Sequence, residues 1–333
     1  MASLDLQLPH TTEGWLVVVI GILVVFLSLA TDTFLTLTNI FDLLNQVSLN
    51  AILAVGLLVV LIAGGIDISF AVAASVVQYL VAVTVMQLGG GDWATGFLLS
   101  AFFGFLLGAV NAFLIHYFRI ISIVVTIATF NVYFGTLMFF TRGVSIYDLP
   151  DWWLDRIVLW EIETPSGYAE ITLPVVVMVV VALATWLLIR RTTFGRQLFA
   201  MGDNPDGARR VGVNIAGMHF LAYGWLGICA GLGGLMAAHR AQEVVPNALI
   251  GTELDVLAAV VLGGARLGGG RGTVFGALLG VALITITQNG LNLLGVSPFA
   301  FRMIVGAVIL VAITLSSGRA RELLGVFKRT RRA

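Results

Sequence analysis

Residues 43–63 read LLNQVSLNAILAVGLLVVLIA and contain no charged side chain. A helix needs about 20 apolar residues to cross the hydrocarbon core of a bilayer, and this run has that length. Apolar and polar residues do not alternate along it, which excludes a strand of a membrane β-barrel. Because backbone groups in lipid must find hydrogen-bond partners within their own segment, the run predicts a transmembrane helix.

Similar runs recur along most of the chain, which has 59% hydrophobic and 11% charged residues. Soluble domains have roughly 45–50% and about 25% of these classes, so a soluble fold is excluded. The runs lie at 14–31, 43–63, 68–88, 95–118, 121–140, 173–190, 216–239, 248–264, 273–294 and 298–316. We therefore expect an all-α membrane protein, a polytopic bundle of about ten transmembrane helices. Its membrane domain covers 14–316, between a short N-terminal segment 1–13 and a basic tail 317–333.

The first hydrophobic run lacks the features of a secretory signal peptide. Residues 1–13 carry Asp5 and Glu13 but no Lys or Arg, and no small-x-small cleavage site precedes Asp32. We interpret this run as a retained span. Cys229 is the single cysteine and lies inside a predicted span, so no disulfide framework is expected.

Charged residues are divided unequally between the two sides of the predicted bundle. With the N-terminus placed inside, the inner segments hold most of the basic residues: Arg119, Arg190, Arg191, Arg196, Arg209, Arg210, Arg266, Arg271, Arg319, Arg321, Lys328, Arg329, Arg331 and Arg332. The outer side holds most of the acidic residues. The positive-inside rule then predicts that both termini are cytoplasmic. The weakest predicted span is 248–264, which carries Glu253 and Asp255 near its outer end.

The outer loop at 141–172 is long, acidic and aromatic. It contains Asp148, Asp151, Asp155, Glu161, Glu163, Glu170, Trp152, Trp153, Trp160 and Tyr168. Tryptophans are frequent at the membrane interface, and that position alone would explain them. A docking surface for an outer partner is the alternative.

The inner loop at about 191–215 contains its own short helix. Asn204 is a suitable N-cap, and Pro205 suits the first helical position, where no N–H is needed. Arg209 and Arg210 fall in the last turn, and Gly212 can end the helix in a left-handed conformation. One interpretation is an amphipathic helix held against lipid by Phe194, Leu198 and Phe199. The other is a rigid lever that docks into a cytoplasmic motor.

Small and polar residues inside the spans have structural and functional interpretations. Three Gly-xxx-Gly pairs, Gly104/Gly108, Gly227/Gly231 and Gly276/Gly280, predict close helix packing. Polar candidates for a transport pathway are Gln46, Asn50, Asn111, His116, Thr126, Thr129, Asn131, Gln288, Asn289 and Asn292. The alternative for each is a hydrogen bond between helices. Asp67 is placed to cap the third span.

The loop sequence Thr193-Phe-Gly-Arg…Ala200-Met-Gly-Asp-Asn-Pro-Asp-Gly-Ala-Arg-Arg-Val-Gly-Val-Asn resembles the coupling segment of bacterial ABC-transporter permeases. The similarity is to the ribose, xylose, rhamnose and autoinducer-2 branch of sugar importers. Ala63-Gly-Gly-Ile-Asp-Ile-Ser, Val261-Leu-Gly-Gly-Ala-Arg-Leu-Gly-Gly-Gly-Arg-Gly-Thr and Asn289-Gly-Leu-Asn-Leu-Leu-Gly-Val resemble further motifs of this family, over roughly 35–316. The sequence departs from the family after Ser69, where Phe70-Ala-Val-Ala-Ala replaces small residues and a Gly.

The resemblance implies a multi-pass permease of the bacterial inner membrane without a catalytic or metal site of its own. Its partners would be a cytoplasmic ABC ATPase, a second permease copy or paralogue, a periplasmic solute-binding protein and membrane lipid, with no nucleic acid. ATP and Mg would be bound by the ATPase, and the permease would bind no cofactor. The residues matching the coupling segment are Gly195, Gly202, Asp203, Asn204, Pro205, Ala208, Arg209, Arg210 and Gly212. The pathway candidates are Asn111, Asn131, Gln288, Asn289 and Asn292.

The residues themselves place any ATPase on another chain. The sequence has one lysine, Lys328, and the glycine-rich run 263–272 lacks the Lys and Ser/Thr of a phosphate-binding loop. A channel would need a ring of filter groups, and an intramembrane enzyme would need clustered catalytic side chains; neither is visible. An ion-coupled secondary transporter of a small polar solute is the remaining alternative, although no acid falls at mid-span. The cargo and the identity of the second permease stay open.

Overall fold

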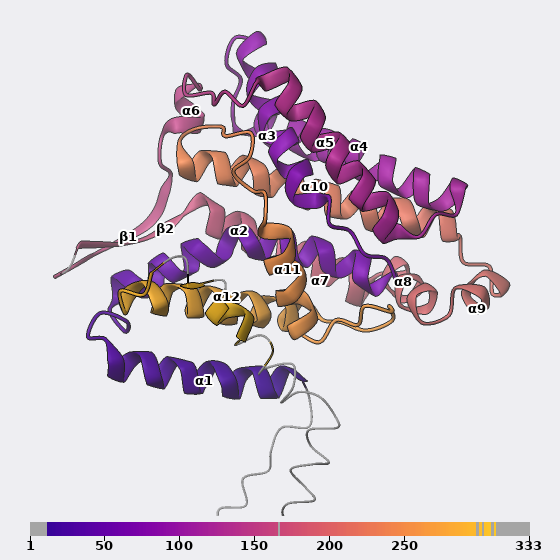
Figure 1. Cartoon of the computed structure of the whole chain (residues 1–333). Helices are drawn as coiled ribbons and strands as arrows, with labels where there is room; N and C mark the ends of the chain where they lie inside the picture. The colour runs from indigo at the N-terminus through magenta and orange to yellow at the C-terminus, as the bar shows by residue number, and fades with distance from the viewer. Residues whose placement is uncertain (1–11, 166, 298–299, 302, 308–309, 311–333) are drawn as a thin grey trace, which may run out of the picture.

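The computed structural model describes residues 12–165, 167–297, 300–301, 303–307 and 310, and these form mainly helices (Figure 1). Eight described helices are long and apolar enough to cross a membrane. They are α1 (Thr12–Ala30), α2 (Leu37–Ile62), α3 (Phe70–Gln87), α4 (Trp93–Phe118), α5 (Ser122–Thr141), α7 (Leu173–Arg191), α10 (Ile215–Ala241) and α12 (Val274–Leu293). The expected count of about ten is not confirmed. The predicted span 298–316 lies largely outside the described residues.

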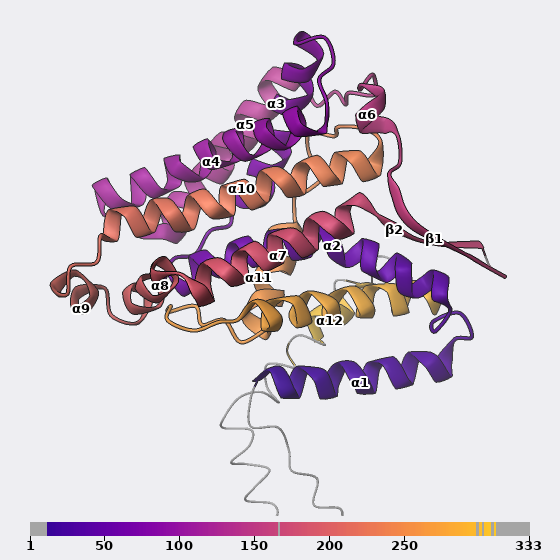
Figure 2. The same ribbon diagram turned by 180° about the vertical axis from the view of Figure 1, so that it is seen from behind.

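Helix α2 is the centre of the bundle. Residues 51–62 of α2 are fully buried, and α10, α7, α12 and α11 (Thr252–Leu262) all contact the helix. Figures 1 and 2 show α3, α4, α5 and α10 on one side of α2, with α12 and then α1 on the other. Because lipid is as apolar as this core, close packing between helices, more than the hydrophobic effect, keeps α2 at the centre of the bundle.

Glycines bring α4 and α10 into backbone contact. A Cβ on Gly104 would overlap the carbonyl oxygen of Gly227, and a Cβ on Gly108 would overlap that of Tyr223. The pair on α12 does the same against α11, where Gly280 faces Ala259. The prediction that the three Gly-xxx-Gly pairs are helix-packing faces is therefore confirmed.

The predicted span 248–264 is not a continuous membrane-spanning helix. Only α11 is helical there, and its 11 residues rise about 16 Å, roughly half the hydrocarbon thickness. Gly251 before it and Gly264 after it have left-handed backbones, with φ of 94° and 92°. The chain still returns from one end of the bundle to the other, partly as irregular backbone. Such backbone is tolerated at membrane depth where protein surrounds it.

The segment 141–172 is more than a connecting loop. It contains the short helix α6 (Asp151–Leu154) and an antiparallel hairpin of β1 (Val158–Thr164) and β2 (Gly167–Thr172). Trp152 and Trp153 stack, and Trp153 is fully buried against the bundle, whereas Trp160 and Tyr168 are exposed. This small hairpin is an addition to a mainly helical protein, which agrees with the expected all-α class.

Candidate functional site

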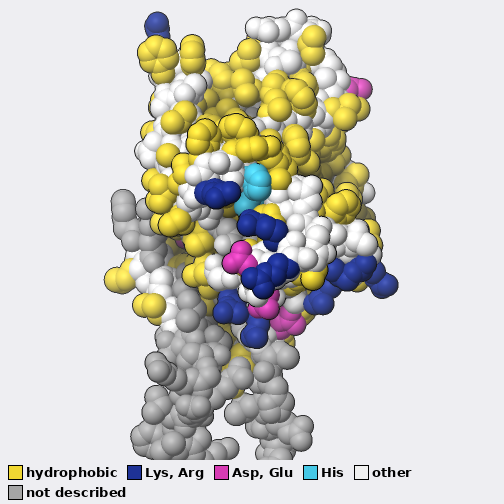
Figure 3. All heavy atoms as spheres, turned by 90° about the vertical axis from the view of Figure 1, so that its right-hand side faces the viewer, with side chains coloured by type: hydrophobic (Ala, Val, Ile, Leu, Met, Phe, Trp, Pro, Cys, Tyr) yellow, Lys and Arg dark blue, Asp and Glu magenta, His cyan; other side chains and the backbone are white. Residues whose placement is uncertain are grey.

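The helices α8 (Thr193–Asp203) and α9 (Pro205–Arg210) project from one end of the bundle. We call this the basic end, because Arg190, Arg191, Arg196, Arg209, Arg210, Arg266 and Arg271 gather on or beside these helices. We call the opposite end, which carries α6 and the hairpin, the acidic end. Figure 3 looks at the basic end and shows basic side chains below a broad hydrophobic band.

The helix predicted in the inner loop is confirmed as α9. Asn204 caps it, with its side-chain oxygen accepting a hydrogen bond from Gly207 N at 2.9 Å. Pro205 occupies the first turn, and Gly212 follows the helix with a φ of 87°. The preceding helix α8 was not predicted as a separate element. It starts at Thr192, whose hydroxyl accepts from Gly195 N at 3.2 Å.

The residues predicted to couple to an ATPase divide into a buried and an exposed group. Gly195, Gly202 and Ala208 are buried against the bundle. The exposed members are Asp203, Asn204, Pro205, Arg209, Arg210 and Gly212. Leu198 is also fully buried, so it does not anchor α8 in lipid, whereas Phe194 is exposed. The pair α8–α9 therefore has an inner face fixed to the bundle and an outer face free to meet a partner.

Three chain segments meet at Gly202 without intervening side chains, in what we call the glycine junction (Gly64, Gly202, Gly269 and Gly270). A Cβ on Gly202 would overlap the carbonyl oxygen of Ile62 and lie 2.6 Å from Gly270 N. Gly270 N donates to Ile62 O at 3.0 Å, which ties the α11–α12 loop to the end of α2. Gly64, Gly269 and Gly270 have φ of 88°, 85° and 73°, a region in which side chains are strained. The backbones of α8, of the end of α2 and of the α11–α12 loop are therefore in direct contact at this point.

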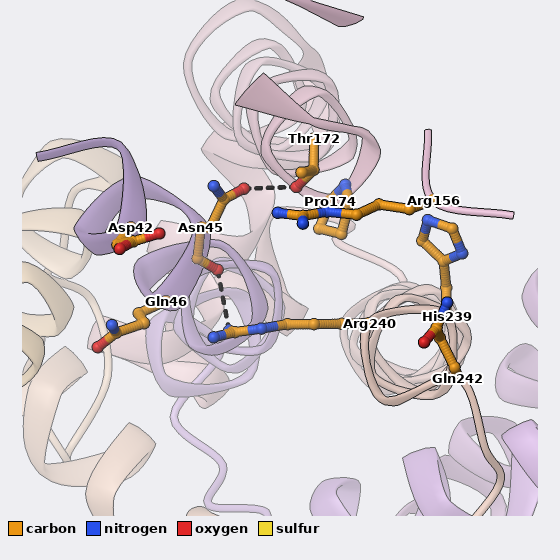
Figure 4. Close-up of a pocket in the computed structure, with 9 residues that line it drawn as sticks. All are labelled: Asp42, Asn45, Gln46, Arg156, Thr172, Pro174, His239, Arg240 and Gln242. Atoms are coloured by element: carbon orange, nitrogen blue, oxygen red, sulfur yellow. Dashed lines mark hydrogen bonds between the residues drawn. The ribbon is translucent and has the colours of Figure 1, made fainter. Parts of the chain in front are cut away.

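A polar pocket of about 280 Å³ opens at the acidic end (Figure 4). Its walls come from α2, from the hairpin and the start of α7, and from the end of α10. It is lined by Asp42, Asn45, Gln46, Arg156, Thr172, Pro174, His239, Arg240 and Gln242. Of these, Gln46 alone was a pathway candidate from sequence. The pocket joins residues up to 200 positions apart, a proximity that no local pattern indicates.

Hydrogen bonds organise the pocket around Asn45. Arg240 donates to the backbone oxygen of Asn45 at 3.2 Å, and the Thr172 hydroxyl donates to its side-chain oxygen. Arg156 forms an ion pair with Glu170, which leaves Arg240 and Asp42 as opposite charges at the pocket. The side chain of Gln46 bonds to no other described residue. The charges thus balance, and the Gln46 amide can donate to and accept from the hydroxyl groups of a neutral solute.

Asp67 lies in a buried polar cluster between the helices. One carboxylate oxygen accepts from the backbone N and hydroxyl of Ser69, at 2.6 and 2.7 Å. The other accepts from Asn111 of α4 at 3.0 Å. The predicted position beside the start of α3 is confirmed, although Ser69 is the N-cap residue. Both carboxylate oxygens are occupied, so the cluster holds the break between α2 and α3 against α4.

The five predicted pathway amides are not brought together. Asn111 belongs to the Asp67 cluster, and Asn289 donates to Asn39 of α2 at 3.0 Å. Gln288 is half-buried and Asn292 exposed, both near the acidic end of α12. Asn131 is exposed in the middle of α5 and donates to Ile127 O within its own helix. Their role in transport stays a prediction.

Comparison with known proteins places the chain in a family. Residues 39–313 match the family described as branched-chain amino acid transport system / permease component. The ribose import permease protein RbsC of Escherichia coli K12 is 32% identical, covering 92% of this chain and 95% of that protein. The galactose/methyl galactoside import permease protein MglC of Salmonella typhimurium is 28% identical (92% and 94% covered). The autoinducer 2 import system permease protein LsrC of Photorhabdus luminescens is 31% identical (91% and 89%).

No solved structure matches the chain. The resemblance noted from the coupling segment is confirmed by the family match and by relatives that cover nearly the whole chain. The multiple apolar helices agree with it, because an import permease must cross the membrane repeatedly. The chain belongs to the family of ABC importer permeases that includes the ribose, galactose and autoinducer-2 permeases.

Proposed function

We propose that this chain is the membrane-spanning subunit of an ATP-driven importer for a sugar or sugar-like solute. The observation that carries the proposal is the pair α8–α9, whose inner face is fixed at the glycine junction and whose outer face is exposed. A short helix that only joined two spans would need neither feature. The ribose, galactose and autoinducer-2 permeases among its relatives support a polar, hydroxylated cargo.

The basic end faces the cytoplasm in this proposal, and both chain termini lie on that side. The chain is a multi-pass protein of the inner membrane, and the excess of arginine at one end follows the positive-inside rule. The acidic end, with its polar pocket, then faces the solute-binding protein. An ABC ATPase docks on Asp203, Asn204, Pro205, Arg209 and Arg210, and it is the ATPase that binds ATP and Mg²⁺. This chain binds no cofactor in the proposed assembly.

The exposed face of α5 lines the translocation pathway and is shared with a second permease. Asn131 is the reason for this assignment, because an exposed amide in the middle of a span is costly in lipid. Ala128 and Gly135 lie beside it on the same exposed face, and nothing lies within 4 Å of a Cβ built on Gly135. Small side chains around a lone amide leave room for water and solute between two copies.

An ion-coupled transporter would require a carboxylate that is free to exchange a proton or bind a cation. The buried carboxylates in the described part of the chain are Asp67 and Glu253. Three hydrogen bonds occupy the two oxygens of Asp67, and Glu253 accepts from Gly251 N at 2.8 Å. The import permeases among the relatives also support the ATP-driven interpretation. A mechanism then follows from the geometry. Closure of the ATPase pair moves α8–α9, and the glycine junction passes that movement to α2 and to the α11–α12 loop.

The test is co-purification in mild detergent at native expression, followed by uptake measurements on a variant. Recovery of a P-loop ATPase with the chain is expected. Asp203→Ala should then uncouple ATP hydrolysis from uptake while the protein stays in the membrane. The control is Asp32→Ala, an exposed acid at the other end of the bundle. A chain that is purified without an ATPase, or normal uptake by the Asp203 variant per amount of protein, contradicts the proposal.

A further inference from the structure

A second pocket, of about 510 Å³, lies at the basic end beside α9. Its polar lining consists of His116 from the end of α4, Arg119 just after it, Arg209 from α9 and His219 from α10. The two histidine rings are 5.6 Å apart at a steep angle. Figure 3 shows a histidine between arginine side chains on this face. The predicted coupling function uses Arg209 alone of this group and leaves the cavity unexplained.

The pocket is positively charged and lacks an internal counterion. Neither Asp nor Glu lines it. In the described part of the chain, the ion pair that forms joins Arg156 to Glu170. Neither Arg119 nor Arg209 is therefore paired with an acidic side chain there. His219 Nδ1 is buried and has no hydrogen-bond partner among the described residues. Two arginines and two histidines thus line the cavity with no acidic side chain among its lining residues.

The rim of the pocket is apolar and exposed. Tyr117 is 63% exposed and Ile121 is 72% exposed, and Phe118 and Val211 nearby are exposed as well. Aromatic and aliphatic side chains at a helix end are typical of the level where a span meets the headgroup region. A ligand in this pocket would therefore contact basic side chains inside the pocket and apolar side chains at its rim.

We propose that this pocket binds the phosphate group of an anionic phospholipid of the membrane leaflet at the basic end. Arginine matches phosphate with paired hydrogen bonds, and basic pockets between spans at the inner surface are suited to anionic headgroups. The acyl chains lie along the exposed side chains of Tyr117, Phe118 and Ile121. A free phosphate ion would use the charges but not the apolar rim. An acidic side chain of a partner protein is a poorer occupant, because it would have to enter a cavity whose rim consists of exposed apolar side chains.

Because Arg209 lies on α9, a bound lipid contacts the proposed coupling surface directly. The lipid holds α9 against Arg119 and the end of α4, so occupancy links the composition of the leaflet to the position of the lever. This consequence depends on the proposed function, whereas lipid binding itself does not. The two can therefore be tested separately.

The experiment is native mass spectrometry of the purified full chain titrated with dioleoylphosphatidylglycerol or dioleoylphosphatidylcholine. Arg119→Gln is compared with Arg142→Gln. Both arginines are exposed, follow the last residue of a span and have left-handed backbones, with φ of 53° and 54°. The two changes thus remove the same charge with the same backbone strain, but Arg142 lies outside the pocket. The thermal midpoint of each variant in detergent alone checks that both fold.

The wild-type chain should bind phosphatidylglycerol more tightly than phosphatidylcholine. Arg119→Gln should weaken phosphatidylglycerol binding about tenfold, the loss expected for one charge-assisted hydrogen bond, and Arg142→Gln should not. Equal affinity for both lipids, or equal effects of both variants, overturns the proposal. If inorganic phosphate alone raised the thermal midpoint as much as the lipid does, the pocket would be a site for a free anion. That result would also overturn the proposal.

Discussion

The glycine junction at the basic end joins its segments through backbone contacts, whereas the polar pocket at the acidic end joins helices through side chains. At the junction, Gly64, Gly202 and Gly269 meet backbone to backbone, and a methyl group on Gly202 or Gly269 would overlap the facing backbone. At the pocket, α2, α7 and α10 separate around about 280 Å³ and contact one another through side chains. The α2 helix takes part in both.

The difference indicates where the molecule must transmit movement and where it must adapt. Backbone contact without side chains leaves no rotamers to absorb a displacement, so a movement of α8 would be passed on to α2. Side chains around a cavity can change rotamer, so the pocket could change shape while the helices stay in contact. In the proposed function, α2 therefore links the end that meets the ATPase to the end that meets the solute.

The largest expected effect comes from adding a methyl group at the junction. Gly202→Ala would place a Cβ against the Ile62 carbonyl and 2.6 Å from Gly270 N, both of them backbone atoms. We expect a loss of about 3 kcal/mol of stability, at the upper end for overpacking, together with uptake reduced to background. The measurement is the thermal midpoint of the purified protein and uptake per amount of protein.

The control for this change is Gly21→Ala in α1, where nothing lies within 4 Å of the added Cβ. It should leave stability and uptake unchanged, because a methyl group there faces open space. If both variants behaved alike, the junction would not be the rigid contact that the comparison assumes.

The second prediction tests whether the rigidity of the basic end extends into the bundle. In Asp67→Asn, an amide nitrogen would face either the Ser69 donors or the Asn111 donor, so at least one hydrogen bond is lost. A buried donor left without a partner costs about 2 kcal/mol. We expect a lower thermal midpoint, and Asn131→Asp on the exposed face of α5 is the comparison that should leave the midpoint nearly unchanged. A stable Asp67→Asn protein would show that the cluster does not hold the α2–α3 break.

The sequence predicted the features that depend on neighbouring residues. Asn204, Pro205 and Gly212 lie within one helix and its caps, and their local chemistry determines its limits. The glycines at 104 and 108 share one helix face, so a spacing of four was enough to predict their packing. The hairpin at 158–172 carries the strand alternation of Trp160 to Glu163, but the aromatic and acidic content of the loop obscured it.

Features that join distant segments could not be predicted in this way. The glycine junction needs residues from α8 and from two loops, and the polar pocket needs α2 and α10 to converge. The segment 248–264 is apolar enough for a span, yet its helix covers only Thr252–Leu262, between the left-handed backbones of Gly251 and Gly264. Hydropathy measures composition, and it does not report where backbone geometry interrupts a helix.

The third prediction concerns the adaptable end. The Gln46 side chain lines the pocket without bonding to a described residue, so Gln46→Ala should leave stability unchanged. If the pocket accepts solute, loss of one hydrogen bond to it should raise the half-saturating concentration for uptake about fivefold. Uptake of labelled ribose or galactose measures this. In contrast, Asn45→Ala removes bonds to Phe41, Glu170 and Thr172 and should lower stability as well. Unchanged uptake by Gln46→Ala would exclude the pocket from the pathway.

The smallest effect on stability is expected from the ion pair at the edge of the pocket. The Arg156 side chain is 62% exposed and that of Glu170 is 16% exposed, and such partly exposed pairs are worth about 1 kcal/mol or less. Arg156→Gln should therefore lower the free energy of unfolding by under about 1 kcal/mol, with a smaller difference at high salt.

Uptake measurements separate two roles for Arg156. If Arg156 only fixes the hairpin, Arg156→Gln and Glu170→Gln should impair uptake equally, because each breaks the same pair. If Arg156 faces the solute, Arg156→Gln should impair uptake more than Glu170→Gln does, because Arg156 lines the pocket and Glu170 does not. We expect the second outcome, because the Arg156 side chain is 62% exposed and lines the pocket, whereas that of Glu170 is 16% exposed and does not.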